Sequence, residues 1–341
     1  MKRALVLGGG GFIGGHLVNN LVERGYWVRS ADIKEHQYSA NPHEFVLCDL
    51  TIASAMLEVV DLPNGEKFDE IYQLAADMGG AGYIFTGEND ANVMLNSSLI
   101  NLNLLQTLVE QKNKENDFPI IFYSSSACIY PEERQTNTLN PGLKESDAYP
   151  ANPDSEYGWE KIFSERLFLA FSRNYKIPVR IARFHNVFGP EGTWRGGKEK
   201  APAAICRKVA EAPNGGIVEI WGDGQQTRSF LYIEDCLKAI EAFMNTEYSG
   251  PLNIGSEEMV SIQELVEIVC SFEEKQLQIK NVPGPQGVRG RNSDNSLVRE
   301  KLNWDASTTL KDGLSQTYNW INSQLAKEGK SSNYKHDKRL K

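Results

Sequence analysis

Residues 3–14 read RALVLGGGGFIG, an apolar run followed by a cluster of glycines. The first five of these residues predict a short buried β-strand, and a helical pattern of apolar residues follows the glycines. Gly8, Gly11 and Gly14 stand three residues apart between the strand and the helix. Glycines in such a turn let the backbone approach a pyrophosphate and let the helix pack closely on the strand, while the helix N-terminus attracts an anion. The stretch therefore predicts the first βα unit of a dinucleotide-binding sheet.

The alternation of strands and helices continues along the first half of the chain. Apolar runs at 26–31, 45–47, 71–74 and 120–123 predict four further strands, and an amphipathic helix is predicted at about 91–112. Strands that alternate with helices argue for βαβ units and a parallel sheet. We therefore expect an α/β protein built on a Rossmann-type doubly wound parallel sheet.

The domain organisation changes about halfway along the chain, where Gly- and Pro-rich loops with clustered charge begin. We expect a dinucleotide-binding Rossmann domain over residues 1–183 and about 222–250. A smaller, interleaved C-terminal substrate lobe is predicted over about 184–221 and 251–325. The polar and basic residues 326–341 predict a disordered tail.

The composition excludes several classes of protein. The chain has 341 residues, 40% of them hydrophobic and 24% charged, which is ordinary for a globular protein with a large core. No apolar stretch approaches the ~20 residues that span a bilayer, and a net charge of −9 argues against nucleic-acid binding. The five cysteines form no Cys-x-x-Cys pair, so neither a disulfide framework nor a metal site is predicted. We expect a reduced, cytoplasmic enzyme that binds neither membrane nor nucleic acid.

Asp32 identifies the dinucleotide, because it stands where the second strand is expected to end. A carboxylate there accepts hydrogen bonds from the adenosine ribose and repels a 2′-phosphate, which favours NAD over NADP. Asp49 and Leu50 follow the third strand and are expected near the adenine. The residues predicted to bind the cofactor are Gly8, Gly11, Phe12, Ile13, Gly14, Asp32, Asp49, Leu50, Ala75, Tyr157 and Lys161.

Tyr157 and Lys161 form a Tyr-x-x-x-Lys pair at the start of a predicted helix, after the fifth strand. Residues four apart share one helix face, and the lysine ammonium is expected to lower the tyrosine pKa so that the phenolate acts as a base near neutral pH. Ser126 would hydrogen-bond the same substrate oxygen, which completes an alcohol-oxidising set. The same spacing recurs at Tyr334 and Lys338 in the polar tail, where we assign it no meaning.

Cys128 lies two residues beyond Ser126 and adds a proton-transfer group that alcohol oxidation alone does not need. A free cysteine is also often a small buried hydrophobe. Lys200 likewise can be an ordinary solvated lysine. Spacing alone leaves both interpretations open for each residue.

Six longer blocks carry a family resemblance, and they stand at residues 75–80, 125–132, 183–186, 192–204, 221–230 and 287–294. In these blocks the chain resembles the extended short-chain dehydrogenase/reductase family, over about residues 3 to 325. Within that family it is most similar to the nucleotide-sugar epimerases that invert C3 and C5 of GDP-mannose.

The resemblance implies an NAD-dependent epimerase, a homodimer, that makes GDP-L-galactose and GDP-L-gulose through transient oxidation at C4. It makes Tyr157 and Lys161 the oxidising pair, and Cys128 and Lys200 the acid and base of epimerisation, in an order that stays open. The substrate contacts that it implies are Gly79, Ser126, Cys128, Asn186, Glu199, Lys200, Ala201, Lys208, Gln226, Thr227, Arg228 and Arg291.

The chain departs from the family pattern beside the site. Residues 132–138 form a more polar loop than expected, and Ala81 and Tyr83 replace the usual Met and Phe after the double glycine. These departures leave the chemistry intact but leave the exact sugar open, including a related GDP-sugar such as a GDP-heptose.

Two other enzyme activities and one non-catalytic function are alternatives. A GDP-fucose-synthase-like 3,5-epimerase-4-reductase consumes NADPH and has a histidine in place of Lys200, so Asp32 and Lys200 both disfavour it. A 4,6-dehydratase needs a carboxylic acid beside the serine, where this chain has Ala127 and Cys128. A non-catalytic NAD-binding regulator is disfavoured by the intact Ser, Tyr and Lys set.

Overall fold

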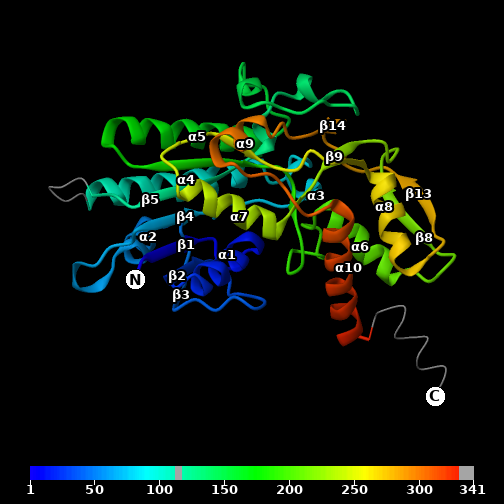
Figure 1. Cartoon of the computed structure of the whole chain (residues 1–341), viewed down its shortest axis with the longest axis horizontal. Helices are drawn as coiled ribbons and strands as arrows, with labels where there is room; N and C mark the ends of the chain where they lie inside the picture. The colour runs from blue at the N-terminus through cyan, green and yellow to red at the C-terminus, as the bar shows by residue number, and fades with distance from the viewer. Residues whose placement is uncertain (112–116, 330–341) are drawn as a thin grey trace.

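The computed structural model describes residues 1–111 and 117–329, and over these residues its centre is a seven-stranded sheet (Figure 1). The strand order is β11-β6-β5-β4-β1-β2-β3, and every neighbouring pair is parallel. The bounds are β1 (Arg3–Leu7), β2 (Trp27–Asp32), β3 (Glu44–Leu47), β4 (Glu70–Gln73), β5 (Ile120–Ser126), β6 (Val179–Phe184) and β11 (Leu252–Ile254). The chain winds outward from β1 in both directions, which confirms the predicted doubly wound α/β fold.

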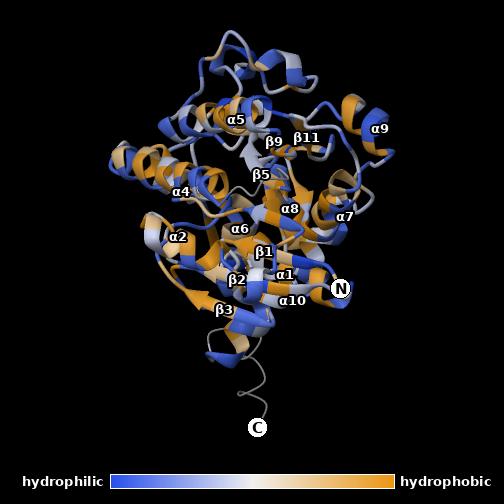
Figure 2. Ribbon diagram, turned by 90° about the vertical axis from the view of Figure 1, so that its left-hand side faces the viewer, coloured by the Kyte–Doolittle hydropathy of each residue, from blue (hydrophilic) through white to orange (hydrophobic). Residues whose placement is uncertain are grey.

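Helices cover both faces of this sheet. On one face lie α2 (Ala53–Val60), α4 (Asp90–Glu110) and α5 (Glu156–Tyr175), and on the other lie α1 (Phe12–Glu23) and α7 (Ile233–Met244). The alternation of side chains along β1 explains the division, because Ala4 and Val6 enter one core whereas Leu5 and Leu7 enter the other. In Figure 2 the ribbons of α4 and α5 alternate between hydrophobic and hydrophilic residues, as expected of helices that cover a sheet.

The second half of the chain adds short strands and helices at one end of the sheet, where α6, α8, α10, β8 and β13 lie together (Figure 1). These elements are α6 (Ala201–Glu211), β8 (Ile217–Trp221), α8 (Ile262–Cys270), β13 (Gln278–Val282) and α10 (Leu310–Lys327). A three-stranded sheet has the order β12-β9-β14, with bounds β12 (Met259–Ser261), β9 (Thr227–Ser229) and β14 (Gly290–Arg291). The remaining elements are α3 (Ala81–Ile84), β7 (Val187–Phe188), β10 (Leu231–Tyr232), α9 (Ser296–Leu302) and five short 3-10 helices at Pro63–Gly65, Ala127–Ile129, Glu132–Gln135, Glu145–Ala148 and Ser271–Glu273.

Two predicted boundaries need correction. Residues 252–254, predicted in the smaller lobe, form β11 and pair with β6 in the large sheet. The tail prediction began at residue 326, but α10 continues to Lys327 because its inward side chains, such as Leu325, are buried. The rest of the predicted tail, 330–341, lies outside the described residues together with Tyr334 and Lys338.

Within the described part of the chain, no helix is both long enough and apolar enough to cross a bilayer.

Candidate active site

The glycine turn between β1 and α1 forms a cradle that side chains would fill. A Cβ on Gly8 would lie 2.6 Å from the backbone nitrogen of Ala75, and Gly8 has a φ of +85°. A Cβ on Gly14 would lie 2.2 Å from the carbonyl oxygen of Gly8. Gly11 caps α1 without a side-chain hydrogen bond, and the first turn of α1 contains no acidic residue. The N–H groups at this helix end are therefore free to bind an anion, which fits the pyrophosphate of a dinucleotide.

The Asp32 carboxylate lies at the end of β2 against this turn. Its Oδ1 accepts a hydrogen bond of 3.1 Å from the backbone N–H of Lys34, and a Cβ on Gly10 would lie only 3.0 Å from its Cγ. Burial raises the pKa of the Asp32 carboxyl, and backbone N–H groups partly offset this effect. The position fits the predicted ribose contact.

Asp49 and Leu50, the predicted adenine contacts, are less available to a ligand than Asp32. Asp49 Oδ1 accepts hydrogen bonds from the N–H and the hydroxyl of Thr51, at 2.9 and 2.7 Å. The Leu50 side chain is 4% exposed and packs in the core beside α2 and α4. The Leu50 side chain is therefore not open to a ligand, and its backbone carbonyl already accepts a 3.1 Å hydrogen bond from the Asn103 amide.

The structure brings Ser126, Tyr157 and Lys161 together at the carboxyl end of β5. Tyr157 and Lys161 lie in the first turns of α5, whose N-terminus is capped by the Ser155 hydroxyl, which accepts a 3.3 Å hydrogen bond from the Gly158 N–H. A Cβ on Gly158 would lie 2.2 Å from the Cys128 carbonyl oxygen, so glycine is required for α5 to approach the end of β5. The Lys161 ammonium lies 5.7 Å from the Tyr157 ring centroid and donates to the Ser124 carbonyl at 3.0 Å.

The expected lowering of the Tyr157 pKa is not what the structure gives. Tyr157 is 7% exposed, and its burial, together with Cys128 and Glu160, raises its pKa well above the ordinary value. A hydrogen bond with Ser126 and the charge of Arg291 act in the opposite direction. Desolvation of the phenolate therefore outweighs the charge of Arg291 and the hydrogen bond with Ser126.

Glu160 supports Lys161 and was missed by the sequence reasoning. Its side chain is fully buried, and its Oε2 lies 4.0 Å from the Lys161 ammonium. Burial lowers the pKa of Lys161, and Glu160 raises it. Helical spacing could have predicted Glu160 as a site residue, because a residue three positions after Tyr157 on α5 lies on the same inward face as that tyrosine.

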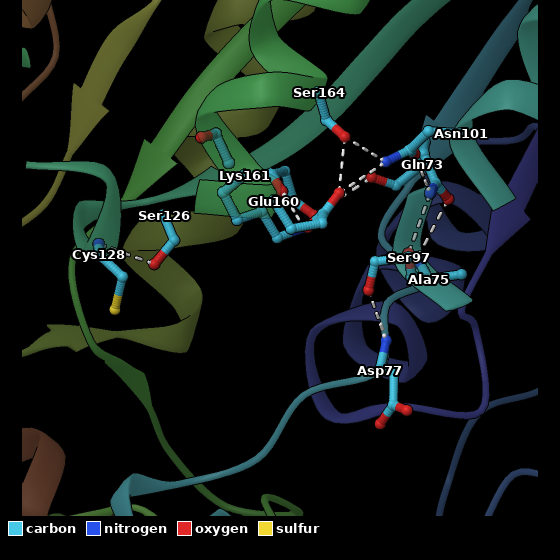
Figure 3. Close-up of polar contacts among 12 residues, drawn as sticks. Gln73, Ala75, Asp77, Ser97, Asn101, Ser126, Cys128, Glu160, Lys161 and Ser164 are labelled. Carbon is cyan, nitrogen blue, oxygen red and sulfur yellow. Dashed lines mark hydrogen bonds and ion pairs between the residues drawn. The ribbon is translucent and has the colours of Figure 1, made fainter. Parts of the chain in front are cut away.

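A polar network connects Glu160 with the end of β4 (Figure 3). Glu160 Oε1 accepts hydrogen bonds from the Ser164 hydroxyl at 2.6 Å and the Asn101 amide at 3.3 Å. Asn101 Oδ1 accepts from Gln73 Nε2 at 2.7 Å, and Gln73 Oε1 accepts from the Ala75 N–H at 3.1 Å. Ala75 also contacts the glycine turn, so this network links the predicted cofactor site to the oxidising pair.

Cys128 lies in the 3-10 helix Ala127–Ile129 and is 9% exposed. Its Sγ lies 3.1 Å from Arg291 Nη1. The other guanidinium nitrogens donate to Gln135 Oε1 at 2.5 Å and to Asp154 Oδ2 at 3.0 Å. Burial opposes the charge of Arg291, but Cys128 and Asp154 outweigh it and raise the Arg291 pKa. The structure thus places Arg291, predicted as a substrate contact, directly against Cys128.

Lys200 lies at the N-cap of α6, in a different segment of the chain from Cys128. Burial lowers the pKa of its ammonium, and nearby Cys128 and Cys236 raise it. Over residues 1–111 and 117–329, no hydrogen bond or ion pair engages this ammonium. A half-buried amine with a lowered pKa and no bound partner is suited to proton transfer.

Two arginines from the smaller lobe face the site from adjacent strands. Arg228 and Arg291 are register partners in β9 and β14. Burial, together with the smaller effect of the neighbouring Arg291, lowers the pKa of Arg228 to about 9. Two like charges so close together favour the binding of an anion between or beside them.

The remaining predicted substrate residues are mostly engaged in the protein. The Asn186 amide donates to the Ser229 carbonyl at 2.9 Å, and the Lys208 ammonium donates to the Glu219 carbonyl at 2.6 Å. The other positions are Gly79, packed against Tyr83; Glu199, paired with Arg207; Ala201, the first residue of α6; Gln226, which is buried and donates to the Trp221 carbonyl; and Thr227, which donates to the Thr138 carbonyl. Their contact with a substrate stays a prediction.

The chain belongs to the NAD-dependent epimerase/dehydratase family, a model of which matches residues 4–255. NAD as the cofactor and epimerase as the enzyme class are thereby confirmed as predictions from the sequence. Among curated proteins it is similar to GDP-mannose 3,5-epimerase 1 of Oryza sativa subsp. japonica, at 45% identity over 329 residues, which cover 96% of this chain and 83% of the rice protein. It is also similar to GDP-mannose 3,5-epimerase of Arabidopsis thaliana, at 44% identity over 326 residues, which cover 95% of this chain and 83% of that protein.

Solved structures share the fold. A UDP-glucose 4-epimerase of Thermotoga maritima superimposes with a TM-score of 0.82 at 24% identity, covering 95% of this chain and 100% of that one. MoeE5 in complex with UDP-glucuronic acid and NAD superimposes with a TM-score of 0.78 at 25% identity, with coverage of 95% and 100%.

Proposed function

We propose that this enzyme inverts C3 and C5 of GDP-mannose and forms GDP-L-galactose and GDP-L-gulose. The observation that carries the proposal is the electrostatic interaction between Cys128 and Lys200, which come from separate segments, beside the Ser126, Tyr157 and Lys161 set. A simple 4-epimerase has no use for this second pair. The 44–45% identity to GDP-mannose 3,5-epimerases of plants supports the choice of sugar nucleotide.

The oxidising half-reaction uses the groups at the end of β5. Bound NAD supplies reversible oxidation at C4. Tyr157 is proposed to take the proton of the C4 hydroxyl and later return it, while Ser126 holds the same oxygen by a hydrogen bond. Because burial raises the pKa of Tyr157, this role depends on the positive charges beside the phenol. Burial lowers the pKa of Lys161, and Glu160 opposes this effect, which favours the charged ammonium next to the tyrosine. No external redox partner is needed, because the second hydride transfer reverses the first.

The epimerising half-reaction uses Cys128 and Lys200. Once C4 is a ketone, the hydrogens on C3 and C5 are α to a carbonyl and become acidic. One of the two side chains removes a proton from one face of the ring, and the other delivers a proton to the opposite face, which inverts the carbon. Burial lowers the pKa of Lys200, which favours the neutral amine that a base requires.

The two arginines of β9 and β14 are proposed to bind the diphosphate of the substrate. Burial and, to a smaller extent, repulsion by Arg291 lower the pKa of Arg228, and an anion beside the two arginines would offset both effects. Guanidinium groups also match phosphate geometry with paired hydrogen bonds. The other predicted substrate residues, from Gly79 to Thr227, are proposed to line the same site.

We propose a homodimer that forms through α4 and α5. These helices lie side by side (Figure 1) and carry exposed apolar side chains: Leu95 and Leu102 on α4, and Trp159 and Phe163 on α5. Trp159 and Phe163 are 38% and 46% exposed and share one helix face. Analytical ultracentrifugation of wild type and Phe163→Glu tests this: a dimer that dissociates in the variant supports the interface, and a monomeric wild type refutes it.

The location proposed for the enzyme is the cytoplasm. All five cysteines are free thiols, and thiols in this number persist most readily in a reducing compartment.

Incubation of the purified enzyme with GDP-mannose and NAD, without NADPH, tests the proposed reaction. New GDP-hexoses separated by chromatography, with inverted C3 or C5 by NMR, are the expected result. A requirement for stoichiometric NADPH would instead support the epimerase-reductase, and turnover of a GDP-heptose but not of GDP-mannose would move the substrate to the related sugar.

A further inference from the structure

Lys200 is held through its backbone and not through its side chain. Its carbonyl accepts a 3.0 Å hydrogen bond from the Ala204 N–H at the start of α6, while no such bond engages its ammonium anywhere in the described ranges, 1–111 and 117–329. The loop before it contains Gly196 and Gly197, with φ values of +92° and +87° and no atoms within 4 Å of an added Cβ. The position of the ammonium therefore depends on what holds residues 198–199.

The segment around α3 holds that loop. The Gly80 N–H donates a 3.0 Å hydrogen bond to the Lys198 carbonyl. A Cβ on Gly80 would lie 2.3 Å from the Glu199 carbonyl oxygen. The two backbones therefore touch directly, one residue before Lys200.

A side-chain contact fastens the same two segments. The Lys198 ammonium lies 3.7 Å from the centroid of the Tyr83 ring, within the range of a cation–π interaction. The Tyr83 hydroxyl donates to Asp77 Oδ1 at 2.8 Å, and Asp77 Oδ2 accepts from the Asn96 amide at 2.9 Å. The Asp77 backbone N–H donates a hydrogen bond to the Ser97 hydroxyl (Figure 3). The ring is thus anchored to α4 on one side and to the Lys200 loop on the other.

The Tyr83 ring also reaches the opposite side of the site. With Met78 and Phe85 it packs against the buried cluster that contains Cys128 and Tyr157. One aromatic side chain therefore touches both the apolar wall next to the thiol and the loop that carries the amine.

We propose that Tyr83 and Lys198 form a clamp that positions Lys200 opposite Cys128 for proton exchange at C3 and C5. This inference rests on the proposed epimerase function. Tyr83 and Lys198 are positioning residues, because they act on the reaction through Lys200. Release of the clamp leaves Ser126, Tyr157 and Lys161 in place, so the two half-reactions separate.

The test compares Lys198→Met and Tyr83→Leu with wild type in two assays. Proton exchange is measured as solvent deuterium incorporated into GDP-mannose and its products, and C4 oxidation as the single-turnover absorbance of reduced nicotinamide. We expect deuterium incorporation to fall by about 10²-fold, the cost of displacing a reacting group by about 1 Å, while C4 oxidation stays near wild type. Lys198→Arg keeps a cation over the ring and is expected to restore exchange.

A matched control removes the same charge elsewhere. Lys301 lies 5.5 Å from the Tyr248 ring centroid, and Lys301→Met is expected to exchange deuterium as wild type does. Because Lys198 is exposed, Lys198→Met decides the question even where Tyr83→Leu fails to fold.

Wild-type exchange in Lys198→Met, or an equal loss of both half-reactions, would overturn the clamp. A wild-type enzyme that incorporates no deuterium at C3 or C5 would instead overturn the proposed function itself.

Discussion

Replacement of Glu160 by glutamine tests how this carboxylate acts on the pKa of Lys161. The change keeps the size of the side chain and removes one negative charge. In wild type the carboxylate is fully buried, its Oε2 lies 4.0 Å from the lysine ammonium, and that oxygen has no hydrogen-bond partner among the described residues. The ammonium is its nearest source of compensation.

The structure sets the size of the effect. Two unit charges 4 Å apart attract by about 4 kcal/mol at the effective dielectric constant of 20 that suits most protein sites. Loss of one partner of a buried ion pair typically costs about 3–5 kcal/mol of stability. Lys161 can avoid part of this cost by releasing its proton, so the loss of unfolding free energy stays at or below that range.

The effect of Glu160→Gln on the pH dependence of C4 oxidation follows from what raises and what lowers the Lys161 pKa. Burial lowers the pKa of Lys161, and Glu160 raises it, so Glu160→Gln lowers it further. A lysine loses its charge as pH rises through its pKa. The alkaline loss of C4 oxidation is therefore expected to move to lower pH in Glu160→Gln.

The assay is the single-turnover rate of C4 oxidation across a pH series, with Ser164→Ala as the control. Ser164 donates to Glu160 Oε1 at 2.6 Å, so its loss weakens the network but keeps the charge. We expect a lower melting temperature without a shifted pH profile in Ser164→Ala. The reasoning is refuted if Glu160→Gln keeps the wild-type alkaline limb, or if Ser164→Ala moves it equally.

Three further predictions concern the residues chosen from the sequence. Tyr157→Phe removes the base and is expected to slow C4 oxidation by about 10²–10⁴-fold without loss of fold by circular dichroism; near-normal rates would remove the tyrosine from the chemistry. Cys128→Ala and Lys200→Ala are each expected to retain C4 oxidation while deuterium incorporation at C3 and C5 collapses, and unchanged incorporation in both would assign the protons to another group. Arg291→Ala is expected to weaken GDP-mannose binding but not NAD binding in separate calorimetric titrations, and an unchanged affinity for the sugar nucleotide would contradict its contact with the diphosphate.

Local sequence was sufficient for the parts of the fold that depend on neighbours in the chain. The strand, glycine turn and helix over residues 3–23 are specified by a periodic apolar pattern and by Gly8 and Gly14, where a Cβ would collide with backbone atoms. β11 escaped prediction because a three-residue strand has too few positions to show a period. β11 forms because it pairs with the edge of β6.

The candidate active site likewise has features that local sequence predicts and features that it does not. Tyr157 and Lys161 are one helical turn apart, so their common face follows from spacing. The contact between Cys128 and Arg291 joins residues 163 positions apart, and no local pattern encodes it. Family resemblance placed both residues in the site, but only the structure shows that they touch.

The charges around the site are arranged as two separate ion pairs, and this arrangement explains why its half-reactions should be separable. Lys161 and Glu160 lie together on α5 behind Tyr157. Arg291 and Asp154 lie 3.0 Å apart beside Cys128, with side chains that are each 5% exposed. Lys161 and Arg291 thus each have a carboxylate of their own, so neither depends on the other for compensation. A substitution in one pair should disturb C4 oxidation, and a substitution in the other should disturb the thiol, because the charges that support the two steps are held by different segments.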